Sequence, residues 1–179
     1  GTINLINATL GAATNPISVS GGTLNLSQDS SLFLSPGENI NTINVDPNTI
    51  NTVYVQANGL LHTDSSNTQS VVINGVSANT HFGISGVSSA PTAATYTPNA
   101  DGSYTLQITL ADGRLLTFGD LHMANGFVPR TNATIVQDGS TGFLAEDSEA
   151  GFFIIEAIAE GPCFLAGSMI RTPEGDVAV

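Results

Sequence analysis

The stretch Ile40-Asn41-Thr42-Ile43-Asn44-Val45 points to the fold class of this chain, because a close copy follows ten residues later as Ile50-Asn51-Thr52-Val53-Tyr54-Val55. Both copies place apolar side chains at every second or third position, with Asn or Thr between them. Such alternation is typical of short β-strands that bury one face. A similar pair of runs, Thr23–Leu26 and Ser31–Leu34, precedes them. We therefore predict an all-β chain that begins with a repetitive region over residues 1–69.

Two arrangements fit this repetition. The copies could be antiparallel hairpin strands joined by a turn at Asp46-Pro47-Asn48, which would suit a sandwich. They could also be successive rungs of a β-solenoid whose Asn side chains line the corners. The region bears a weak resemblance to the strand-loop-strand repeats of bacterial passenger and adhesin-like domains.

A β-meander is predicted within the second region, residues 70–162. Ala94–Thr97 leads through a Gly-containing turn into Ser103–Leu110, where apolar side chains alternate. The turn Asp112-Gly113 then leads into Arg114–Phe118, and Asp-Gly between alternating runs is a strong hairpin signal. Farther along, Phe152–Ala159 is apolar on both faces and rich in aromatic and β-branched residues. We predict that it is a strand buried on both sides, leading towards the segment that begins at Cys163.

Composition narrows the classes of partner. Lys and Arg total 3 against 15 Asp and Glu, so the net charge is −12 and nucleic acid or anionic membrane surfaces would be repelled. The chain has no lysine, and its polar positions are dominated by Asn, Thr, Ser and Gly. The most apolar run, Gly151–Ala159, is too short to span a bilayer, so we expect no membrane insertion. We expect an extracellular or cell-surface protein whose export signal lies outside this sequence.

The histidines give little reason to expect a metal or a cofactor. His62, His81 and His122 lie far apart in the sequence and lack partners at ligand spacing. His62 with Asp64, and Asp120 with His122, are two residues apart, so on a strand each pair would share a face and could hydrogen-bond. The acidic segment Glu146–Glu149 is expected to be a solvated loop, and the Asp-containing turns match no calcium-binding loop.

The only cysteine, Cys163, opens the segment CFLAGSMIRTPEGDVAV, residues 163–179. A thiolate at this position can reach the carbonyl carbon of the preceding residue through a five-membered ring, so proximity assists attack on the backbone. Gly167 and Ser168 permit a tight bend, and Met169–Thr172 alternates like a short strand. Pro173-Glu174-Gly175 is predicted to be a turn, followed by the start of a second strand.

This segment resembles the opening block of the Hint (hedgehog/intein) self-processing domain, in its bacterial, non-intein forms. The matching positions are Cys163 to Ser168, then Ile170, Thr172, Pro173 and Gly175. In that family the first cysteine performs an N-to-S acyl shift, so the resemblance implies that Cys163 is the nucleophile and that Pro162 precedes the scissile bond. Residues 163–179 would then be the truncated start of a Hint domain.

The family supplies its remaining catalytic groups, a Thr-x-x-His motif and later His, Asp or Asn residues, downstream of this block. None can be assigned within residues 1–179, so we expect this chain alone to lack a complete active site. The thioester formed at Cys163 would be resolved by water or by an external nucleophile.

The sequence is also compatible with two other functions. In the first, the chain is an adhesin-like structural module whose Asn- and Thr-rich strands bind a surface glycan or a protein, and Cys163 performs no chemistry. In the second, weaker one, histidines and carboxylates gather in a hydrolytic cleft, which requires two or three residues far apart in the sequence to meet.

Overall fold

The computed structural model describes residues 1–18, 20–35, 40, 42–56, 67–87, 90–137, 153–160, 169–172 and 175–178. Every regular element in these residues is a β-strand, which confirms the predicted all-β class. The strands are β1 (Thr2–Ile6), β2 (Thr9–Leu10), β3 (Thr23–Ser27), β4 (Ser31–Leu34), β5 (Thr42–Val45), β6 (Asn51–Gln56), β7 (Asn67–Val76), β8 (Thr80–Ser85), β9 (Ala93–Pro98), β10 (Tyr104–Thr109), β11 (Leu115–Met123), β12 (Thr134–Gln137), β13 (Phe153–Glu156), β14 (Met169–Thr172) and β15 (Gly175–Ala178).

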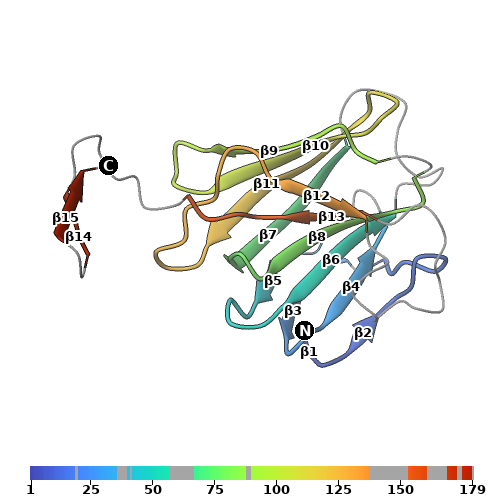
Figure 1. The fold of residues 1–179 in the computed structure, drawn as a ribbon. Helices are drawn as coiled ribbons and strands as arrows, with labels where there is room; N and C mark the ends of the chain where they lie inside the picture. The colour runs from blue at the N-terminus through green and yellow to red at the C-terminus, as the bar shows by residue number, and fades with distance from the viewer. Residues whose placement is uncertain are drawn as a thin grey trace.

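Two mixed sheets form the body of the protein (Figure 1). The seven-stranded sheet has the order β1-β3-β5-β7-β11-β10-β9, and the six-stranded sheet has the order β12-β13-β8-β6-β4-β2. From β1 to β8, consecutive strands alternate between the sheets, and each pairs in parallel with the strand two places along the chain. The chain therefore winds through four coils of a two-sided β-solenoid, with one strand per coil in each sheet.

The structure decides between the two arrangements left open by the sequence. β5 and β6 carry the two quoted copies but lie in different sheets, so the Asp46-Pro47-Asn48 turn does not close a hairpin. The copies are instead the two halves of one coil. The structural repeat is longer than the spacing of these copies. The Asn25 side chain hydrogen-bonds to Asn4, 21 residues earlier, and the Asn44 side chain hydrogen-bonds to Asn25, 19 residues earlier.

Both sheets change from parallel to antiparallel pairing after the fourth coil. β11 pairs in parallel with β7 but antiparallel with β10, which pairs antiparallel with β9, so the predicted meander is confirmed. In the other sheet β13 pairs antiparallel with both β8 and β12. β13 is also buried on both faces, as predicted, with Phe153, Ile154 and Ile155 all buried. Strands from residues 1–69 and from residues 70–162 occur in both sheets.

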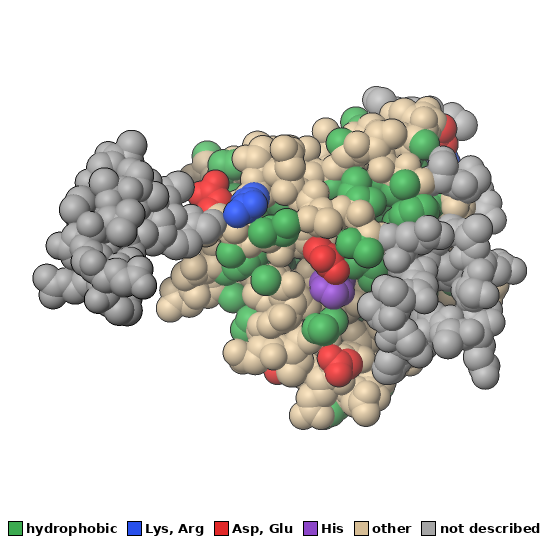
Figure 2. Space-filling view, viewed as in Figure 1, with side chains coloured by type: hydrophobic (Ala, Val, Ile, Leu, Met, Phe, Trp, Pro, Cys, Tyr) green, Lys and Arg blue, Asp and Glu red, His purple; other side chains and the backbone are tan. Residues whose placement is uncertain are grey.

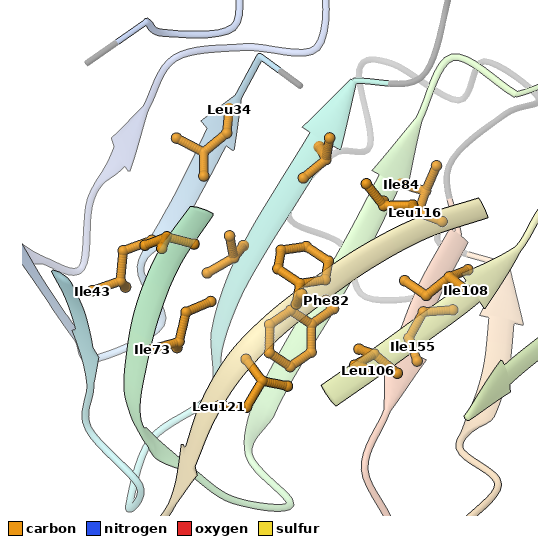
Figure 3. Close-up of a cluster of buried hydrophobic side chains, with 14 of the residues drawn as sticks. Leu34, Ile43, Ile73, Phe82, Ile84, Leu106, Ile108, Leu116, Leu121 and Ile155 are labelled. Atoms are coloured by element: carbon orange, nitrogen blue, oxygen red, sulfur yellow. The ribbon is translucent and has the colours of Figure 1, made fainter. Parts of the chain in front are cut away.

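The main core lies between the two sheets (Figure 3). The inward row formed by Leu24, Ile43, Ile73 and Leu121 is at most 1% exposed, and it faces Phe82, Ile84 and Ile155 of the other sheet. The Phe82 and Phe118 rings meet at a centroid distance of 4.8 Å. At β1 the same row ends in Ile3, which is 47% exposed because β1 is the edge of the described sheet.

A second, smaller cluster lies on the outer face of the six-stranded sheet. Its buried members are Phe33, Tyr54 and Ile154, and the first two rings stack at 4.4 Å with an interplanar angle of 5°. Gly83 lies between Tyr54 and Ile154 in the same row. A Cβ atom at Gly83 would overlap the Tyr54 ring, so this row depends on the absence of a side chain there.

The strands β14 and β15 form a separate two-stranded antiparallel sheet (Figure 1). The strands predicted on either side of the Pro173-Glu174-Gly175 turn are thereby confirmed. Among the described residues there is no helix of the length and apolar character needed to cross a membrane.

The substitution Gly83→Ala tests the parallel register of β6 and β8. Because the added methyl group overlaps the Tyr54 ring, we expect the free energy of unfolding to fall by about 1–3 kcal/mol. Urea unfolding followed by circular dichroism measures this loss. In a Tyr54→Ala background the same substitution should be nearly neutral, because the overlapping ring is gone. An equal loss in both backgrounds would contradict the register.

Candidate functional site

The predicted nucleophile Cys163 and its neighbour Pro162 lie outside the described residues, but the chain before them is well anchored. The backbone N–H of Arg130 donates to the carbonyl of Ile158 at 2.7 Å, and the N–H of Glu160 donates to the carbonyl of Val128 at 2.8 Å. These bonds hold the chain to the body as far as Glu160. The described chain is therefore hydrogen-bonded to the body up to Glu160, two residues before Pro162.

In the segment after the junction, β14 and β15 pair as antiparallel strands. Met169 is paired with Ala178 and Thr172 with Gly175, with no break in register between them. This is the local structure expected of two short strands around a Pro- and Gly-containing turn. The residues that follow Cys163 thus contain a β-hairpin of their own, distinct in pairing from both larger sheets.

The two described histidines lie on different sheets. His81 on β8 lies near Glu156 on β13, with Nε2 and Oε1 4.0 Å apart, and His122 Nε2 lies 2.8 Å from Asp120 Oδ1 on β11. The second contact confirms the predicted pair. His62, Asp64 and the acidic segment Glu146–Glu149 lie outside the described residues. In the part of the chain that is described, no three His, Cys, Asp or Glu side chains are grouped closely enough for a metal site, and Figure 2 shows only scattered charged side chains on the visible face.

The outer faces of the two sheets differ in exposure. On the six-stranded sheet, the Phe33, Tyr54 and Ile154 row is covered, with each side chain at most 5% exposed. On the seven-stranded sheet, the outward side chains of β1 are exposed and those of β3 and β5 are partly exposed. The outward side chains of β1, β3 and β5 are therefore more accessible than the Phe33, Tyr54 and Ile154 row.

An asparagine ladder crosses this accessible face. Each Asn side chain donates from Nδ2 to Oδ1 of the Asn in the preceding coil, with distances of 2.7, 2.8 and 2.9 Å. The members in order are Asn4, Asn25, Asn44 and Asn74. A parallel row two residues earlier in each strand contains Thr2, Thr23, Thr42 and Val72. We call these eight residues the Thr/Asn face.

The Thr/Asn face ends at the Asp120 and His122 contact of β11. His122 is paired in register with Asn74, and Asp120 with Val72, so the next strand continues both rows with ionisable groups. Nearby, hydrogen bonds from the side chain and backbone of Ser103 lower the pKa of Asp101, and the charge of His122 lowers it further. The hydroxyl of Ser103 donates to Asp101 Oδ1 at 2.7 Å. Electrostatic interactions are thus concentrated just beyond the uncharged face.

The sequence-based predictions did not include this face, because they rested on copies about ten residues apart. The signal that would have found it is the triplet Thr-x-Asn, which starts at Thr2, Thr23 and Thr42. The expectation that Asn side chains line the corners holds for Asn51 and Asn79. Asn51 Oδ1 accepts from the backbone N–H of Ser30, and Asn79 Nδ2 donates to a backbone carbonyl of the neighbouring coil.

Comparison of the chain with protein-family models, with curated proteins and with solved structures finds no match.

The substitution Ser103→Ala tests the electrostatic description of Asp101. Loss of the hydroxyl should raise the pKa of Asp101 towards its ordinary value, while the remaining backbone N–H keeps the pKa below that value. A carboxyl whose pKa is lowered by folding stabilises the protein above its unfolded-state pKa, and this contribution disappears as the pH falls through the folded-state pKa. The variant should therefore lose less stability on acidification than the parent.

Carbon-detected NMR titration of the side-chain carboxyl groups measures this shift. Asp112 is the internal control, since its pKa is lowered by Arg114 and should not respond. An unchanged Asp101 pKa in the variant would refute the assignment.

Proposed function

We propose that this chain is the β-solenoid module of a secreted or surface protein, joined at Cys163 to a Hint-type self-processing domain. Cys163 is the nucleophile of an N-to-S acyl shift at the Pro162–Cys163 bond. The observation that carries the proposal is the segment 163–179, which combines the Hint-like opening block with an in-register hairpin at β14 and β15.

The anchoring of the chain before the junction also supports this proposal. Backbone hydrogen bonds hold residues up to Glu160, so cleavage after Pro162 would leave every strand of the two larger sheets in the released module. The downstream product would begin at Cys163 and retain β14 and β15 as neighbours in sequence and in pairing. A cut at this bond would therefore interrupt none of the described strand pairings.

The proposed reaction requires only groups of the chain and water. The Cys163 thiolate attacks the Pro162 carbonyl carbon, and the peptide C–N bond breaks as its nitrogen gains a proton. A thioester on Sγ and a free α-amine at Cys163 result. Water then hydrolyses the thioester to a Pro162 carboxylate and regenerates the thiol. An external nucleophile can take the acyl group instead, whereas no lysine of this chain can do so because the sequence contains none.

The proposed location follows from composition. A net charge of −12, with Asn, Thr, Ser and Gly at most polar positions, suits an exported β-rich module and disfavours binding to polyanions. The uncharged and accessible Thr/Asn face is compatible with a role outside the cell, where the module would present that face to its surroundings.

Intact-mass spectrometry tests the processing role. Expressed with the Hint domain complete beyond Val179, the parent should yield a fragment ending at Pro162, and added thiol or hydroxylamine should increase its amount. Cys163→Ala should abolish this fragment, because no thioester can form. The proposal fails if parent and variant both remain intact, or if both are cut alike.

Pro162 gives a second test of the same chemistry. Proline fixes its own backbone torsion and restricts how its carbonyl meets the thiolate. In the same complete protein, Pro162→Gly should accelerate the first step several-fold, measured as the initial rate of thiol-induced cleavage. The double variant with Cys163→Ala should show no cleavage. A slower or unchanged rate in Pro162→Gly would contradict attack at this carbonyl.

A further inference from the structure

The Thr/Asn face is a two-dimensional array with two regular spacings. Successive coils place equivalent residues one strand apart, about 4.8 Å, and the Thr and Asn rows are two residues apart along a strand, about 6.7 Å. The pairing of β1, β3 and β5 is parallel and in register throughout. β7 continues both rows with Val72 and Asn74. The side chains of this face therefore repeat in two directions.

The conformations of these side chains are restricted in the free protein, by hydrogen bonds between the Asn residues and by the branched Cβ atoms of Thr and Val. Each central Asn uses one N–H and one lone pair of Oδ1 within the ladder, which leaves a second N–H and a second lone pair free to meet solvent. The β-branched Thr and Val side chains are stiff at χ1. Ordering this surface against a rigid partner thus costs little side-chain entropy.

The chemistry of the face excludes several classes of ligand. The strands β1, β3, β5 and β7 contain no charged and no aromatic residue, although the chain carries a net charge of −12. An ionic partner would find no complementary charge on these strands. A sugar ring would find no aromatic platform on which to stack. What remains is a regular pattern of methyl, hydroxyl and amide groups.

We propose that the Thr/Asn face binds the surface of ice. Both spacings of the array are close to repeat distances between water oxygens on the prism faces of hexagonal ice. The methyl and hydroxyl groups of Thr and the free amide positions of the ladder would hold water molecules in that pattern. These ordered water molecules would then become part of the ice lattice. Ice is a neutral and periodic partner, as the face requires. This inference is independent of the chemistry at Cys163.

Ice-affinity partitioning of residues 1–179 tests the proposal. Ice is grown slowly from a dilute solution, and the protein in the ice and liquid fractions is measured. We expect the parent to be enriched in the ice and to inhibit ice recrystallisation. Thr23→Tyr/Thr42→Tyr should abolish both effects, because two large rings would stand above the plane of the face. Tyr favours β-structure, so the strands should be retained.

The matched control is Thr134→Tyr, the same change on the outer face of the six-stranded sheet, where Thr134 shares a row with Glu156. It should partition like the parent, as should Cys163→Ala. If the double Tyr variant loses its fold by circular dichroism, Thr23→Ser/Thr42→Ser replaces it; removal of the two methyl groups should reduce partitioning while preserving the hydroxyls.

Three results would overturn the proposal. The parent could be excluded from ice, the Thr134 control could lose as much partitioning as the face variants, or the parent could bind insoluble chitin or cellulose and not ice. The last result would assign the face to a neutral glycan. Because Cys163→Ala is included, failure of ice binding is distinguishable from failure of self-processing.

Discussion

In-register stacking of successive coils is the constraint on which the rest of the structure depends. Side chains alternate between the two faces of a strand, so a slip of one residue would exchange the inward and outward rows. In β3 such a slip would place Leu24 on the outer face and Asn25 in the core. Burial of one such leucine is worth about 1.5–3 kcal/mol, whereas one hydrogen bond of the Asn ladder contributes about 1 kcal/mol. The apolar rows therefore supply most of the stability, and the ladder adds a penalty against mismatched coils.

The same constraint explains how coils of unequal length coexist. Asn74 lies 30 residues after Asn44, compared with 19 residues between Asn25 and Asn44, yet the ladder continues at 2.9 Å. Most of the extra residues lie between the end of β6 and Val72, the first residue of β7 that pairs with β5, and so fall outside the strand segments that stack. Because the entropy of closing a loop grows slowly with its length, an insertion at a corner costs far less than one within a strand. The faces can thus be preserved while the corners vary.

The parts of this fold that the sequence predicted are those set by short-range chemistry. The Asp112-Gly113 turn, the β9–β11 meander and the apolar strand β13 depend on neighbouring residues and were recognisable from them. The Asp120 and His122 contact likewise follows from two-residue spacing. The solenoid could not be chosen over a hairpin, since the local alternation in β5 and β6 is the same for both. Only pairing across 19 to 21 residues separates them, and that pairing produces the Thr/Asn face.

The placement of the two proposed sites makes their activities compatible. The Thr/Asn face lies on the outer side of the seven-stranded sheet, whereas the strand that precedes the junction, β13, belongs to the six-stranded sheet. β13 is held between β8 and β12, and backbone hydrogen bonds to Val128 and Arg130 continue that anchoring up to Glu160. A chemical step after Pro162 would therefore break no strand pairing that supports the coils. Cleavage would change what the module is attached to, while the stacking that creates its outer face stays as it is.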